Sequence, residues 1–202
     1  MRTFPVYEGL LKHYSSYFRA ALKKVWIEGQ SKSVTLPTED PEVFRAFFRW
    51  ISTGKLYSRL APDGKIPLTF ETICEIYVFG DARGAPELCN ATINMLFQKC
   101  MQDWVYPSST LDYIYDNTPD KSVLRNFVVD YAVETFSFSD IRLNEPEYPK
   151  SFLVSVIKRL VEVDERLCYM NRGPPGNYIH WKKTQICSKY HDHSAAEPAS
   201  LP

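Results

Sequence analysis

The chain has 202 residues, in which 24 Lys and Arg side chains balance 24 Asp and Glu side chains. This length suffices for one large domain, or for one domain with an extension, that buries a sizeable core. A formal net charge of zero provides no global field to attract nucleic acid or an anionic membrane surface, so we expect neither as a partner. Aromatic residues make up 14 % of the chain, which favours packed cores and protein contact surfaces.

The cysteines and the first residues indicate a compartment. Five cysteines are an odd number, and no C-x-x-C pair or small secreted framework is present. The opening residues lack the pattern of a signal peptide, and no stretch approaches the roughly 18 uninterrupted apolar residues of a membrane span. We therefore expect an intracellular protein of the cytoplasm, the nucleus or both.

Residues 4–22 predict two short helices. Pro5 precedes the run, and the pair Ser15-Ser16 predicts that one helix stops and a second starts, capped by a serine hydroxyl. Large apolar side chains recur at steps of three and four residues, which places them on one helical face. These residues are Leu10, Leu11, Tyr14, Tyr17, Phe18, Ala21 and Leu22. Such a stripe must pack against another element.

A short strand and a strong helix are predicted next. In residues 32–37, Val34 and Leu36 alternate with polar neighbours, which is typical of a strand. The following helix has Asp40 as its cap, Pro41 at its first position and Gly54 after its end. Its predicted stripe consists of Phe44, Phe47, Phe48 and Ile51.

Further helices are predicted along the rest of the chain. One runs from Thr69 to Gly84, and the next begins at Pro86 and carries apolar residues on two faces. Three later segments also have helical periodicity: 106–119, 120–134 and 149–163, the last with a stripe of Phe152, Leu153, Val156, Ile157 and Leu160. We expect a loop at 136–149 and disorder at the closing "SAAEPASLP".

Three segments in order resemble a family. "FPVYEGLLKHYSSYF", "VTLPTEDPEVFRAFFRWISTGKL" and "IYVFGDARGAPELCNATI" are together similar to the BTB/POZ domains abundant in filamentous fungi, over about residues 4–100. The resemblance implies a helical cluster capped by a small sheet, used for dimerisation and partner recruitment, with no catalysis of its own. The chain departs from the family at Tyr7 and Glu8, where His and Lys are usual, and has no counterpart of the first strand pair before Phe4.

We therefore predict an α/β, predominantly helical fold. It comprises a BTB/POZ-like helical cluster with a small, incomplete sheet at 1–100, a helical extension at 101–167 and an irregular Cys/His-containing tail at 168–202. The predicted interface residues are Leu10, Leu11, Tyr14, Tyr17, Phe18 and Trp50. Their stripe would be covered by a second copy in a homodimer or by the chain's own helices around residues 121–161.

The resemblance also raises a finer role, as substrate adaptor on a cullin-type ubiquitin ligase. Family members that bind cullins tend to carry a hydrophobic residue two positions before an acidic one near the start of the helix after the "Y-T-G" loop. This chain has Thr72 and Cys74 there, and "Y-T-G" itself has become Ser52-Thr53-Gly54.

The alternative from another class is a metal-binding, hydrolytic or regulatory protein that uses its tail. Cys187, His191 and His193 mix the thiol and imidazole ligands that zinc prefers. The second half of a zinc motif is missing, so we favour a polar surface tail over a metal site. We expect no enzyme activity and no cofactor, because no G-x-S-x-G, phosphate loop or H-E-x-x-H occurs.

The basic pairs Lys23-Lys24 and Lys182-Lys183 are too short to indicate nucleic-acid binding. A transcription regulator would need a DNA-binding segment that this chain lacks.

Overall fold

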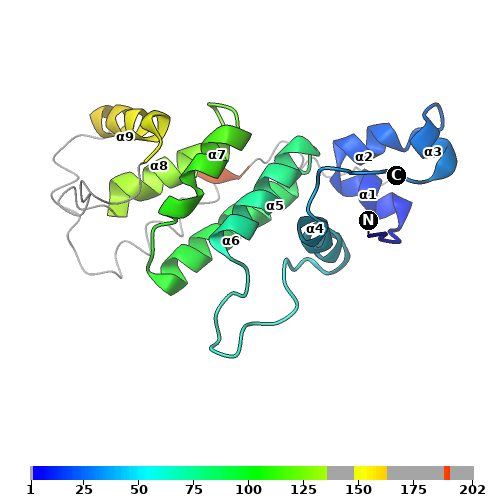
Figure 1. Cartoon of the computed structure of the whole chain (residues 1–202), viewed down its shortest axis with the longest axis horizontal. Coiled ribbons are helices and arrows are strands. Elements are labelled where there is room, and N and C mark those ends of the chain that lie inside the picture. Colours follow the sequence, from blue (N-terminus) through cyan, green and yellow to red (C-terminus); the bar gives the residue numbers. More distant parts are fainter. Residues whose placement is uncertain (1, 136–147, 163–188, 192–202) are drawn as a thin grey trace, which may run out of the picture. The chain divides into compact units, whose positions relative to one another are not determined.

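The structure, a computed structural model, describes residues 2–135, 148–162 and 189–191 (Figure 1). Contacts divide it into two compact units, one ending at Lys99 and the other running from Cys100 to His191. The predicted predominantly helical character is confirmed. The expected small sheet has no counterpart in the described residues, where none is in a strand. The three-part division of the chain stays a prediction, because most of the third part lies outside these residues.

The opening helices form as predicted, with a break at Ser15. Helix α1 spans Glu8–Tyr14 and α2 spans Ser16–Ala21. The Ser15 hydroxyl accepts a hydrogen bond from the backbone N–H of Phe18 at 3.2 Å, so it caps α2. A further short helix, α3 at Ile27–Ser31, was not predicted, because five residues are too few to show a period.

Helix α4 spans Pro41–Thr53 and begins and ends as predicted. The Asp40 carboxylate accepts a hydrogen bond from the Glu42 N–H at 2.7 Å, and Gly54 closes the helix with a left-handed φ of 71°. The strand predicted at 32–37 is wrong. Val34 and Leu36 do turn towards the core, but no neighbouring chain lies alongside to form a ladder, so the alternation reflects burial alone.

Helices α5 at Phe70–Ala82 and α6 at Pro86–Asp103 follow. The Thr69 hydroxyl accepts from the Thr72 N–H at 3.1 Å and caps α5. Helix α4 lies between the opening helices and α5 (Figure 1), and contacts both. Phenylalanines of these three elements form the centre of the first unit. The Phe47 ring lies 5.9 Å from that of Phe18 and 5.3 Å from that of Phe79.

The second unit contains a 3-10 turn η1 at Ser108–Thr110, α7 at Leu111–Asn117, α8 at Val123–Thr135 and α9 at Lys150–Glu162. Helix α8 packs against α9, and both contact α7. Of the predicted α9 stripe, Phe152 and Val156 are buried, whereas Leu153 and Ile157 are 37 % and 61 % exposed among the described residues. The predicted loop and the predicted disordered end fall almost entirely outside the described residues.

We expect Phe47→Ala to lower the unfolding free energy by about 3–5 kcal/mol, because it empties the centre of the first unit. Phe47 is fully buried and contacts rings from α2, α4 and α5. Urea unfolding followed by circular dichroism measures the change. The control is Ile157→Ala, whose side chain is 61 % exposed and whose removal should change stability by no more than about 0.5 kcal/mol. Equal effects of the two variants would contradict this core.

Candidate functional site

Two of the six predicted interface residues belong to the core. Phe18 is 2 % exposed and Trp50 is 9 % exposed, so neither presents its ring to a partner. The other four are half-buried against the same core: Leu10, Leu11, Tyr14 and Tyr17. The rings of Tyr14 and Trp50 lie 4.9 Å apart, edge to face.

The cover of the opening stripe comes from within the first unit. Phe18 and Tyr14 pack on Phe47 and Trp50 of α4. The Tyr17 ring lies beneath the Arg83 guanidinium, at 4.7 Å from its centre. Residues 121–161, named above as a possible cover, belong to the second unit. A cover from that segment or from a second copy of the chain stays a prediction.

A close backbone contact joins the opening helices to the turn between α5 and α6. The Ser16 N–H donates to the Gly84 carbonyl at 3.0 Å, and the Tyr17 N–H donates to the Arg83 carbonyl at 3.3 Å. The Ser15 hydroxyl also donates to the Arg83 carbonyl, at 2.6 Å. The first N–H groups of a helix have no partner within it, and here the turn supplies the acceptors. Glu39 pairs with the Arg83 side chain and fixes it over this joint.

Gly84 is required at this joint for two reasons. Its φ of 56° is left-handed, and a Cβ on it would lie 2.0 Å from the Ser16 Oγ and 3.3 Å from the Ser16 Cβ. The sequence analysis identified Gly84 as a helix stop but could not identify its partner, which lies far away along the chain.

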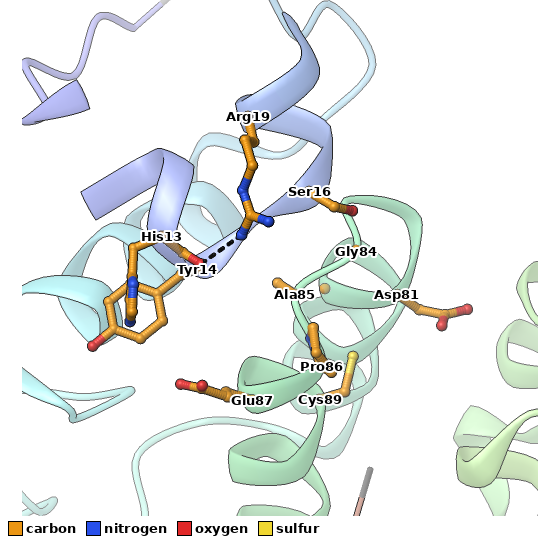
Figure 2. A pocket seen from close by; sticks show the side chains of 11 residues that line it. His13, Tyr14, Ser16, Arg19, Asp81, Gly84, Ala85, Pro86, Glu87 and Cys89 are labelled. Carbon is orange, nitrogen blue, oxygen red and sulfur yellow. Dashed lines mark hydrogen bonds between the residues drawn. The ribbon is translucent and has the colours of Figure 1, made fainter. Parts of the chain in front are cut away.

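A cleft of about 370 Å³ opens beside the joint (Figure 2). Residues of both charge signs line it, but Arg19 is already used, since its guanidinium donates to the Lys12 carbonyl at 2.8 Å and to the His13 carbonyl at 3.2 Å. These bonds provide hydrogen-bond donors for the last carbonyl groups of α1, which have no partner within the helix. Figure 2 shows the Asp81 carboxylate directed away from Arg19.

The same cleft contains a thiol and an imidazole. The Cys89 thiol donates to the Tyr77 carbonyl at 3.7 Å, and His13 lines the same cleft. Two of the lining side chains, those of Arg19 and Cys89, thus bond to backbone carbonyls.

The most unusual surface of the first unit is the run Val25, Trp26 and Ile27, which we call the apolar knuckle. These side chains are 76 %, 57 % and 80 % exposed. The backbone that carries them is tightly held, because the Trp26 N–H donates to the Lys23 carbonyl at 3.0 Å and a Cβ on Gly29 would lie 2.0 Å from that same oxygen. This surface was not predicted, although three consecutive large apolar residues outside any helical or strand period are a sequence signal for it.

A buried carboxylate organises the second unit. Asp130 on α8 is 3 % exposed and pairs with the Arg159 Nε of α9 at 2.8 Å and with the Lys189 Nζ at 2.6 Å. The Tyr190 hydroxyl donates to the same carboxylate. Buried charges are stable only when paired in this way. The signal in the sequence was an Asp within the apolar run "FVVDYAV".

The tail residues proposed as metal ligands are mostly outside the described residues. His191 is half-buried, whereas Cys187 and His193 lie outside. In the part of the chain that the structure describes, no three His, Cys, Asp or Glu side chains gather as a metal site. Nor does any helix there combine the length and apolarity of a membrane span. Lys23 and Lys24 are exposed, and Lys182 and Lys183 lie outside the described residues.

Comparison with known proteins identifies no family for this chain. No protein-family model, curated protein or solved structure matches the chain. The BTB/POZ resemblance stays a prediction from the three sequence segments.

We expect Gly84→Ala to be more destabilising than Gly64→Ala. Both glycines have left-handed φ values, 56° and 79°, so both variants incur about 1–2 kcal/mol of backbone strain. A Cβ at Gly64 meets nothing within 4 Å, whereas at Gly84 it meets Ser16, which should cost about 1–3 kcal/mol more. Thermal and urea unfolding measure both. A double-mutant cycle that combines Gly84→Ala with Ser16→Gly should remove the additional loss of stability that Gly84→Ala shows over Gly64→Ala. If that additional loss is unchanged, the contact between residue 84 and Ser16 is contradicted.

Tyr190 should make stability depend on alkaline pH. Its pKa is raised above the ordinary value, chiefly by burial and then by the hydrogen bond and charge of Asp130. The neutral phenol is thus favoured in the fold, and its stabilisation is complete below about pH 10 and is lost as the pH rises above that value. We expect Tyr190→Phe to lower the unfolding free energy by about 1–3 kcal/mol at pH 7.

The difference between wild type and Tyr190→Phe should remain constant from neutral pH to about 9 and shrink above about 10. Burial also raises the pKa values of Tyr106 and Tyr131, but both proteins carry these residues, so the difference isolates Tyr190. Urea unfolding across this pH series makes the measurement. A difference that grows with pH would contradict the assigned hydrogen bond.

Proposed function

We propose that the chain is a non-catalytic protein–protein interaction module that self-associates and recruits other proteins. The family behind this proposal is the BTB/POZ domain, on the sequence segments quoted above. The observation that carries it is the apolar knuckle, in which Val25, Trp26 and Ile27 expose their side chains on a tightly held turn. Exposed apolar surface that stays in place is typical of protein contact sites.

The charges around the knuckle favour a second copy of the chain as its partner. Lys23 and Lys24 precede it and Glu28 follows it, and none of the three forms an ion pair among the described residues. In a two-fold dimer, the same patch of both copies meets, so the lysines of one copy would face Glu28 of the other. A formal net charge of zero adds no long-range repulsion between copies.

The first unit exposes a further aromatic side chain just before α1. Tyr7 is 76 % exposed. Tyrosine and tryptophan are the side chains that most often anchor protein interfaces.

A role as adaptor on a cullin-type ubiquitin ligase is the finer proposal, and it rests on the resemblance. Of the two positions that correspond to the family's cullin contact, Cys74 is fully buried and Thr72 is half-buried. A cullin would therefore have to contact other residues of this chain.

The self-association test uses light scattering on the full chain over a concentration series. We expect a dimer, and we expect Trp26→Ser with Ile27→Ser to weaken it by at least about tenfold, as the loss of a central aromatic does. The matched control is Ile157→Ser, which removes an apolar side chain 61 % exposed on α9. Circular dichroism verifies that each variant is folded. A chain that stays monomeric throughout would refute self-association.

Charge reversal tests the partner arrangement separately. Glu28→Lys alone, or Lys23→Glu with Lys24→Glu alone, should weaken the dimer because like charges then meet. Mixing these two variants should restore association as a heterodimer, since every lysine again faces a carboxylate. Failure of the mixture to associate would exclude the two-fold arrangement.

A further inference from the structure

A second surface of the first unit is a groove of about 480 Å³. It lies between the C-terminal end of α4, residues 54–60 and the middle of α6. Trp50 and Leu56 are its most buried lining residues, at 9 % and 4 % exposure, and Met95 of α6 is half-buried beside them. We call this surface the α4–α6 groove. Its volume falls within the range of binding pockets, about 300–1,000 Å³.

The open side of the α4–α6 groove carries positive charge. Lys55 and Arg59 both line it and both are exposed, and neither forms an ion pair among the described residues. No Asp or Glu side chain is among its lining residues. Leu60, 48 % exposed, continues the apolar surface out to this positive edge. An apolar floor thus adjoins two uncompensated cations.

The segment that forms this edge is held in place. The Lys55 N–H donates to the Thr53 hydroxyl at 3.3 Å, and the buried Leu56 anchors the next residue. Beyond Leu60, the Ala61 N–H donates to the Lys65 carbonyl at 2.8 Å and closes a turn. A surface that is formed before binding loses less conformational entropy when a ligand arrives.

We propose that the α4–α6 groove binds a short peptide segment of a partner protein, in which a large apolar side chain adjoins an Asp or Glu. The apolar side chain would lie against Leu60 and Met95, and the carboxylate would pair with Lys55 and Arg59. This inference rests on the proposed function, because it specifies what the interaction module recruits.

The shape of the groove favours a peptide over a small molecule. Sites for small molecules bury about 70–90 % of the ligand surface. Here one wall consists of exposed residues, among them Gly54, Lys55 and Ser58, so a bound ligand keeps one side in solvent. An extended peptide tolerates this, because its backbone can stay hydrated while alternate side chains are buried. Two cations are too few to indicate nucleic acid.

The test selects heptapeptides from a random phage-displayed library on the full chain and measures the selected peptides by fluorescence polarisation. We expect them to carry Asp or Glu next to Leu, Phe, Ile, Met or Trp. Lys55→Glu with Arg59→Glu should weaken their binding at least tenfold, and Leu60→Ser should also weaken it. The matched control, Lys150→Glu with Lys158→Glu, reverses two exposed charges in the second unit and should leave the affinity unchanged.

Three results would overturn the proposal: no peptide is enriched, the enriched peptides lack an acidic residue, or they bind the Lys55→Glu and Arg59→Glu variant as tightly as wild type. Circular dichroism of the variants excludes misfolding as the cause of a loss. Light scattering on the same samples separates the two proposals. A dimer without peptide binding refutes the groove alone, whereas a monomer that binds these peptides refutes self-association and leaves the groove standing.

Discussion

The first unit depends on the approach of Ser16 to Gly84. At this point the N-terminus of α2 has no acceptors of its own, and the carbonyls of Arg83 and Gly84 supply them. The contact requires the turn between α5 and α6 to pass within hydrogen-bond distance of α2. A Cβ at residue 84 would crowd Ser16, and a residue with a side chain would have to adopt a left-handed φ, so glycine is favoured there. Since α4 lies between α5 and the opening helices, the joint also encloses the phenylalanine core.

The two proposed contact surfaces have a common basis in this arrangement. The core of the first unit contains Phe18 and Trp50, whereas Val25, Trp26 and Leu60 are exposed on short connecting segments and Ile27 is exposed at the first residue of α3. The apolar knuckle follows α2, and the exposed edge of the α4–α6 groove follows α4. Connections on a rigid scaffold commonly carry binding residues, because they can vary without disturbing the core. Charged side chains border both surfaces: lysines and Glu28 at the apolar knuckle, and Lys55 and Arg59 at the α4–α6 groove. Such charges select partners of complementary charge more than they raise the affinity.

How far the sequence predicted this structure depends on the distance between interacting residues. Asp40, Gly54 and Thr69 mark helix ends through local hydrogen bonds and backbone preferences, so α4 and α5 could be placed from the sequence. The strand at 32–37 was wrong because alternation shows which side chains are buried, whereas a strand also requires a partner. The burial of Phe18 illustrates a similar limit, since periodicity shows that it lies on an apolar face but not what covers that face.

Asp130 has a consequence for the order in which the chain folds during synthesis. The described part of the first unit is one continuous stretch that leaves the ribosome early. Tyr190 lies 60 residues after Asp130, which corresponds to several seconds at about 5–20 residues per second. During that interval the nascent α8 carries a carboxylate without Lys189 and Tyr190, and until residue 159 it also lacks Arg159, so burying it then is unfavourable. Completion of the second unit therefore waits for Lys189 and Tyr190, and slow translation before these residues would prolong exposure of its apolar helices.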